Sequence, residues 1–440
     1  MTAAGLRVPR ARWIVIGAAL VVCSALLWVT RNFTFYFDEW SFILTAPDWS
    51  AATYFEPHNE HPSMLLRVAY AVLLNTVGLR SYLPYMALLY LAHFACVVLL
   101  FELVRRRSGD GIAFAAAAIL LVLGAGWEDL YWAWQMAWLG SVALGLGALL
   151  AVQEPGPRRL ALAVILLAAS VSFSGVGIPF VVAVGIYLSL IPARRRELLA
   201  LIPLAVGLLA WYVLFGRFGE HPNPQPDATN LLRDPVYVAW GLSQSAGALF
   251  GVTGNAGVVV LIVALALLIV AWRVHRPDAT TIGVAVGLIG FYAVAGLTRA
   301  QLGIQQSGAS RYIYPAAAMW LVVLADAARV LPWRGTWRPA LAACAFLACF
   351  NNAVVLYEFG VAKTVQMERA AADLQALAAT RNDPCLDPNA RPDLLVMPDA
   401  VASTYYRAVD HYGDPGSGRP LEDRGAYDAA RAALRKPGCR

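Results

Sequence analysis

The chain has 440 residues, of which 59% are hydrophobic and only 14% are charged. Soluble domains carry about 25% charged residues, so this composition excludes an ordinary soluble protein and predicts a polytopic membrane protein. The formal net charge of +6 does not indicate nucleic-acid binding. The whole basic excess lies within residues 1–360, where arginines report orientation in a membrane.

The N-terminal part predicts a first membrane span followed by a polar loop. The apolar run 13–30 follows several arginines, but it is too long for the apolar core of a signal peptide and lacks a small-residue cleavage pattern, so we expect it to be retained. A loop rich in carboxylates occupies 31–63. The apolar segment 64–80 is short and holds Arg67 and Arg80, which favours a helix lying on the outer membrane surface.

Ten further crossings complete a predicted all-α membrane domain over residues 1–358, whose outer loop with its juxtamembrane helix covers 31–83. A break at Ser172-Phe173-Ser174-Gly175 divides the long apolar stretch 159–191 into two of these crossings. The others are expected at 84–104, 111–126, 133–152, 198–215, 254–272, 280–298, from Arg311 onward, and at 338–357. Two polar loops and a second surface helix are expected at 217–235, 299–310 and 236–251, in that order.

The basic residues predict the orientation of the chain. If segment 64–80 does not cross, 16 of the 23 basic residues in 1–360 fall on one side, and 11 of the 17 acidic residues fall on the other. The basic side is then cytoplasmic. Richness in Ala, Arg and Gly is typical of a high-GC bacterium, so we expect eleven crossings of a bacterial inner membrane, with the N-terminus cytoplasmic and the C-terminus outside. The cytoplasmic set is Arg7, Arg10, Arg12, Arg105–Arg107, Arg158, Arg159, Arg194–Arg196, Arg273, Arg276, Arg329, Arg334 and Arg338.

The tail, residues 359–440, is predicted to form a small extracytoplasmic α/β domain. Its pattern indicates an amphipathic helix at about 361–381 and a short strand over 393–398. Of the six cysteines, only Cys385 and Cys439 lie outside apolar runs. An oxidising compartment would allow these two to form a disulfide, whereas the cysteine spacing matches no zinc pattern.

Ionisable residues gather on the predicted outer side. An Asp-Glu pair follows the first span, a histidine-rich loop comes about twenty residues later, a second pair of carboxylates follows the third span, and an arginine opens the tenth. These residues are Asp38, Glu39, His58, Glu60, His61, Glu128, Asp129, Arg311 and Tyr312. Their convergence suggests a site. The alternatives are a solvated loop for the carboxylates and histidines, and an interfacial arginine whose head reaches water.

Several of these residues belong to longer motifs. They are Phe37-Asp38-Glu39-Trp40, His61-Pro62, Arg105-Arg106-Arg107-Ser108-Gly109, Glu128-Asp129 and Arg311-Tyr312-Ile313-Tyr314-Pro315. In order and position they resemble the GT-C superfamily of membrane glycosyltransferases, which includes protein mannosyltransferases, aminoarabinose transferases and arabinofuranosyltransferases. The resemblance covers residues 1–150 well and 300–330 loosely, and the tail matches no known module.

The resemblance implies an inverting glycosyltransferase of cell-wall or other glycan biosynthesis. Such an enzyme moves a sugar from a polyprenyl-phosphate donor to an extracytoplasmic glycan, lipid or protein. Asp38 is then the expected general base, with Glu39 in reserve, and Arg311 with Tyr312 would bind the donor phosphate. Acceptor or metal ligands are expected among Glu128, Asp129, His58, Glu60 and His61, with Mg²⁺, Mn²⁺ or Ca²⁺ as the divalent cation.

Two other classes remain open from the residues alone. A lipid or glycolipid transporter or flippase places ionisable residues in mid-membrane and often shows inverted repeats. Here the ionisable residues lie mainly near one face and no repeat is evident, which favours an enzyme. In a membrane scaffold or assembly factor, Asp38 would be dispensable.

Overall fold

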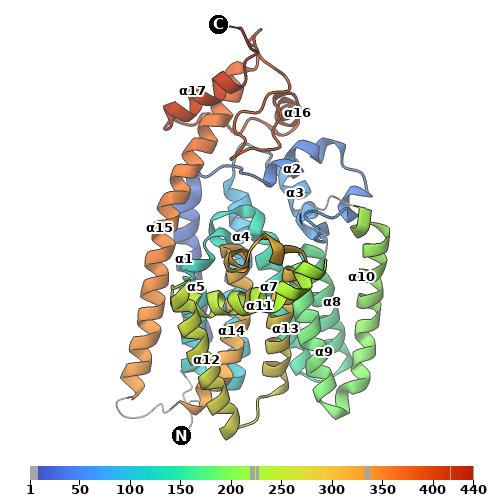
Figure 1. Ribbon diagram of the computed structural model, residues 1–440, viewed down its shortest axis with the longest axis vertical. Coiled ribbons are helices and arrows are strands. Elements are labelled where there is room, and N and C mark those ends of the chain that lie inside the picture. Colours follow the sequence, from blue (N-terminus) through green and yellow to red (C-terminus); the bar gives the residue numbers. More distant parts are fainter. Residues whose placement is uncertain (1–7, 219–222, 224–226, 332–336, 417, 440) are drawn as a thin grey trace.

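The structure, a computed structural model, describes residues 8–218, 223, 227–331, 337–416 and 418–439. Within these ranges the regular structure is helical, and pairing between extended segments is limited to two isolated β-bridges. The N-terminal and C-terminal ends lie at opposite ends of the molecule (Figure 1). Arg7 and Arg334 lie outside the described residues, as do residues 219–222 and 224–226 of the predicted loop 217–235.

The α-helices follow one another along the chain with short connections. They are α1 Ala11–Val29, α2 Glu39–Thr45, α3 Met64–Thr76, α4 Leu83–Ser108, α5 Asp110–Leu121, α6 Glu128–Tyr131, α7 Met136–Gln153, α8 Pro157–Phe173, α9 Ile178–Leu190, α10 Ile202–Leu214, α11 Ala228–Ala248, α12 Asn255–Val274, α13 Ala279–Arg299, α14 Ser310–Ala327, α15 Trp337–Thr380, α16 Ala402–Tyr412 and α17 Arg424–Ala433.

Eight helical segments in the described ranges are long and apolar enough to cross a membrane. They are Ala11–Asn32, Leu83–Ser108, Ala133–Gln153, Pro192–Phe218, Asn255–Val274, Ala279–Leu302, Ser310–Val330 and Pro339–Thr380. The chain is therefore a polytopic membrane protein, as predicted. The other three expected crossings correspond to α5, α8 and α9, with 12, 17 and 13 residues. A 12-residue helix extends about 18 Å, so the total of eleven crossings stays a prediction.

Two expected surface helices form, with different bounds. Helix α3 covers Met64–Thr76 within the predicted segment 64–80. Helix α11 begins at Ala228, inside the predicted loop 217–235, because the Asp227 side chain caps it by accepting a hydrogen bond from the Asn230 backbone N–H. In Figure 1, α11 runs across the view, whereas α14 runs along the long axis of the molecule.

The predicted break between 159 and 191 is confirmed and positions part of the site. Helix α8 ends at Phe173, and a 3₁₀ turn at Gly175–Gly177 leads into α9. Helix α9 then packs closely on α13. Cβ atoms added at Gly283 and Gly287 would lie 2.4 Å and 2.6 Å from backbone oxygens of α9. Small residues allow this close approach of two helices.

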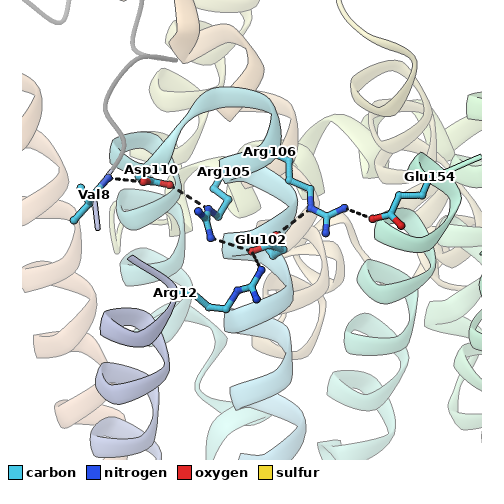
Figure 2. A network of polar contacts seen from close by, with 7 residues as sticks. All are labelled: Val8, Arg12, Glu102, Arg105, Arg106, Asp110 and Glu154. Atoms are coloured by element: carbon cyan, nitrogen blue, oxygen red, sulfur yellow. Dashed lines mark hydrogen bonds and ion pairs between the residues drawn. The ribbon is translucent and has the colours of Figure 1, made fainter. Parts of the chain in front are cut away.

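Three of the predicted cytoplasmic arginines, Arg12, Arg105 and Arg106, meet at one end of the bundle. Glu102 of α4 binds Arg12 of α1 at 3.1 Å and Arg106 at 3.0 Å, and Arg106 also binds Glu154 at the end of α7 (Figure 2). The carboxylates of Glu102 and Glu154 thus join α1, α4 and α7 at the end opposite the tail. The side of the membrane that this end faces stays a prediction.

The tail differs from the predicted α/β domain. Helix α15 is continuous over Trp337–Thr380, so the expected last crossing and the expected amphipathic helix are one element. The predicted strand at 393–398 is wrong, since that segment forms turns. The physical reason is Asp393, whose carboxylate accepts hydrogen bonds from the backbone N–H groups of Leu395 and Val396 and so stabilises a turn.

A disulfide closes the end of the tail. Cys385 and Cys439 are bonded, with their Cα atoms 5.7 Å apart. Beside the bridge, the Lys436 backbone N–H donates to the Cys385 carbonyl. The C-terminal segment is thereby held against the stretch that follows α15.

Candidate functional site

A polar cavity of about 360 Å³, here called the Asp38 chamber, collects many of the predicted site residues. It lies among the outer loop, the start of α7, the break after α8 and the junction of α13 with α14. Its lining is Phe37, Asp38, His58, Asn59, His61, Ser63, Leu66, Trp132, Trp134, Gln135, Ala137, Trp138, Phe173, Ser174, Asn223, Arg299, Arg311 and Tyr312. Asp38, His58, His61, Arg311 and Tyr312 therefore share one space.

Asp38 is the N-cap residue of α2 and follows a residue with an unusual backbone conformation. The preceding residue, Phe37, has φ 53°, a left-handed value that residues other than glycine rarely adopt. The Phe37 N–H donates to the carbonyl of Val396 in the tail at 2.9 Å. Strained residues persist only where the surroundings fix them, so the tail stabilises the turn that directs Asp38 into the chamber.

The electrostatics of Asp38 suit a proton acceptor. Burial raises the pKa of Asp38 to about 6, with the Arg311 guanidinium opposing and the Asp399 carboxylate reinforcing the rise. A carboxylate with this pKa is ionised at neutral pH and is more basic than an exposed one. It thus combines the correct protonation state with greater basicity, as a general base requires.

Glu39 does not line the chamber, and its carboxylate is buried among tyrosines that donate hydrogen bonds to it. Its side chain is 0% exposed and accepts hydrogen bonds from Tyr70 Oη at 2.6 Å, from Tyr82 Oη at 3.0 Å and from the Tyr36 backbone N–H at 2.9 Å. Burial raises the pKa of Glu39 to about 7 against the effect of these bonds. The carboxylate anchors the loop that carries Asp38.

His58 and His61 form a two-residue hairpin at the wall of the chamber. Their backbones exchange hydrogen bonds of 3.0 Å and 2.9 Å, and the residues between them, Asn59 and Glu60, both have positive φ. This is the backbone signature of a tight type I′ turn. Burial, followed by the nearby arginines, lowers the pKa of His58 to about 4 and of His61 to about 3. Both imidazoles are therefore neutral hydrogen-bonding groups at neutral pH.

Glu60 does not line the Asp38 chamber, but its carboxylate pairs with Arg299, the second arginine of the chamber. The carboxylate lies 3.5 Å from Arg299 and accepts a hydrogen bond from Asn223 Nδ2 at 3.0 Å. Arg299 ends α13 and lines the chamber together with Arg311 at the start of α14. Two guanidinium groups thus share a space with Asp38, a combination suited to a phosphate.

Glu128 and Asp129 lie outside the lining of the chamber. Glu128 caps α14, because its carboxylate accepts a hydrogen bond from the Arg311 backbone N–H at 3.0 Å. Asp129 is 0% exposed, and neither of its carboxylate oxygens has a hydrogen-bond partner in the described residues. Burial raises the pKa of Asp129 well above its usual range, with Glu128 reinforcing and Arg311 opposing the rise. Across the described part of the chain, no group of three or more His, Cys, Asp and Glu side chains is placed to hold a metal ion.

An apolar cavity of about 360 Å³ adjoins the Asp38 chamber. It lies among α9, α10 and α13 and is lined mainly by aliphatic and aromatic side chains. His61, Trp138, Arg299 and Tyr312 line both cavities. A ligand with a charged head and a hydrocarbon chain could therefore place its head between the arginines while its chain stays in an apolar environment.

Arg299, Asn223 and Trp138 were not predicted as binding residues. The polar loop predicted at 299–310 was a signal for Arg299, whereas tryptophans near a span end, such as Trp138, are common at membrane interfaces and so gave no specific signal. Ser174 came from a break that was predicted only as a topological feature. The break can approach His61 because Gly175 lacks a side chain. A Cβ at Gly175 would lie 2.7 Å from His61 Nδ1.

Comparisons with known proteins give no assignment. No family model, curated protein or solved structure matches this chain.

Proposed function

We propose that the protein is a membrane glycosyltransferase of the GT-C type that moves a sugar from a polyprenyl-phosphate donor to an acceptor hydroxyl at the outer membrane face. One observation carries the proposal. A polar chamber that contains a partly buried aspartate and two arginines adjoins an apolar cavity between membrane helices and shares four residues with it. A lipid phosphate bearing a sugar requires this combination of environments.

The proposed reaction is a single displacement. The acceptor oxygen attacks the anomeric carbon and its proton passes to Asp38, while the bond from that carbon to the phosphate oxygen breaks. The electron pair leaves with the polyprenyl phosphate, whose charge Arg299 and Arg311 stabilise. Attack opposite the leaving group inverts the anomeric configuration. Neutral His58 and His61 hydrogen-bond to sugar or phosphate oxygens.

The experiment is transfer by the purified protein in lipid nanodiscs. Radiolabelled polyprenyl-phosphate pentoses and hexoses are supplied with cell-envelope acceptors, and the products are separated from the donor. Enzyme-dependent transfer with inversion supports the proposal. If the protein instead moves the intact donor across vesicle membranes and forms no new glycosidic bond, the transporter alternative is correct and the proposal fails.

A further inference from the structure

A second polar cavity of about 660 Å³, here called the Trp49 chamber, lies on the other side of the histidine hairpin. His58 and Asn59 line both this chamber and the Asp38 chamber. The remainder comes mainly from α2, the loop after it, Arg67 of α3 and the segment after α10. Two polar cavities thus share one narrow wall, and the proposed reaction so far uses only one of them.

Arg67 is the first sign that this cavity is a binding site. The residue is 6% exposed, and its guanidinium carbon lies 4.3 Å from the centre of the Phe42 ring and 5.4 Å from that of Trp49. Its Nε is buried without a hydrogen-bond partner among the described residues. A buried cation with unsatisfied donors costs free energy, and a ligand oxygen would remove that cost.

Trp49 supplies a fixed aromatic surface. Its indole nitrogen donates to Thr45 Oγ1 at 3.1 Å, and its ring packs edge-on against Phe42, with centroids 5.4 Å apart and planes at 87°. Around it lie short hydroxyl side chains and the carboxylates of Asp48 and Glu56. A flat ring presents an apolar surface to the C–H face of a sugar, while carboxylate and guanidinium groups hydrogen-bond to its hydroxyls.

We propose that the Trp49 chamber binds a saccharide and is the acceptor subsite of the proposed glycosyltransferase. The assignment of the chamber as an acceptor site rests on the proposed function, whereas the inference that it binds a saccharide rests on the residues of this chamber alone. The shared wall at His58 and Asn59 would place the end of a bound saccharide next to the chamber that holds Asp38. Among the acceptor classes named above, the polar lining favours a glycan, because a lipid acceptor would require the apolar surroundings found in the other cavity.

The test measures binding without turnover. The full-length protein in nanodiscs is titrated with short mannan, glucan, arabinan and galactan oligosaccharides, with a serine- and threonine-containing peptide, and with polyprenyl phosphate as separate probes. Glu56→Gln removes an exposed carboxylate, and Arg67→Gln removes the buried cation. Each should weaken binding of the preferred oligosaccharide about tenfold or more, as expected for the loss of a charge-assisted hydrogen bond.

A control variant and a paired comparison keep the outcomes distinct. Asp428→Asn changes an exposed carboxylate on α17, outside the chamber, and should leave oligosaccharide binding unchanged. Arg67 also packs against the rings of Phe42 and Trp49, so Arg67→Gln could disturb the local structure. Its effect is therefore compared with that of Glu56→Gln, which preserves the shape of an exposed side chain.

Two results would overturn the inference. One is that no oligosaccharide in the panel binds, or that the peptide binds in its place. The other is oligosaccharide binding that is indifferent to both Glu56→Gln and Arg67→Gln. Failure of the proposed function is a separate result, in which oligosaccharide binds with the expected dependence on these residues but no sugar is transferred from any lipid donor.

Discussion

Asp38 and Glu39 are neighbours in sequence with opposite surroundings. Successive side chains on a helix project about 100° apart, so at the start of α2 one carboxylate enters the chamber and the other enters a buried group of tyrosines. The resemblance singled out Asp38 as the expected base and kept Glu39 in reserve, but the sequence alone could not show which of the two carboxylates enters the chamber. That choice depends on Tyr70 and Tyr82, which come from later elements.

The pH dependence of transfer follows from Asp38. A proton on its carboxylate prevents it from accepting the acceptor proton, so kcat/KM should fall as the pH drops through about 6 and should be level just above that value. The groups that face Asp38 are Arg311 and Asp399, while the histidines are already neutral in this range. Asp399→Asn should move the acid limb to lower pH. A limb that stays in place in this variant would contradict the assigned influence of Asp399 on the base.

Among the elements, the break between α8 and α9 shows what pattern alone could predict. Hydropathy predicted that the stretch 159–191 divides at 172–175, and it does. The pattern could not reveal that the break contributes Phe173 and Ser174 to the chamber, because that depends on packing against His61 from a distant loop.

Gly175→Ala tests this packing. A Cβ would lie 2.7 Å from His61 Nδ1, so the His61 ring must move, and turnover should fall by about tenfold or more, as misplacement of a site group by an ångström can do. Gly207→Ala is the matched control, because a Cβ there meets nothing within 4 Å. Equal activities of the two variants in the transfer assay would show that the His61 position does not matter.

The tail elements are coupled to the site by contacts that the sequence did not reveal. Tyr405 of α16 packs against Trp40 with ring centroids 5.5 Å apart, and Arg419 donates to the carbonyls of Asn32 and Phe33. Together with the bond from Phe37 to Val396, they join the tail to both ends of the Asp38 turn. The predicted cysteine pair could be inferred from polarity, whereas this docking required the three-dimensional arrangement.

Replacing Cys385 and Cys439 by serine should loosen the tail. The bridge joins residues 54 positions apart, and its loss removes about 4 kcal/mol of stabilisation in the chain-entropy model. Hydrogen exchange should accelerate in α16 and α17 and at Phe37, while α4 keeps its protection. Unchanged exchange at Phe37 in a variant whose α16 and α17 exchange rapidly would show that the tail does not stabilise the Asp38 turn.

For the molecule as a whole, the polytopic class and the separation of charged residues were accessible from sequence. The long apolar helices and the clustering of Arg12, Arg106 and Glu154 agree with that analysis. The strand predicted at 393–398 was wrong, because the Asp393 side chain stabilises a turn there. The adjacent apolar cavity was also beyond prediction, since it depends on how α9, α10 and α13 are arranged in space.

The orientation can be measured by labelling single cysteines with an impermeant thiol reagent in cells with a permeabilised outer membrane. A cysteine at the exposed position Ser50 should react, and one at the exposed position Arg158 should not. Ser108 is unsuitable for the inner position because it is buried. Cys344, which is exposed, is first replaced by serine. Labelling at Arg158 without labelling at Ser50 would reverse the topology.

The central claim is that the Asp38 chamber transfers a sugar from a lipid phosphate. The most direct measurement compares wild-type protein with Asp38→Asn, recording binding of the polyprenyl-phosphate sugar and its transfer separately. The variant keeps the volume of the side chain but removes the proton acceptor, so donor binding should persist while turnover falls about 10²–10⁴-fold, the usual contribution of a general base. Near-normal turnover by folded Asp38→Asn protein would contradict the account.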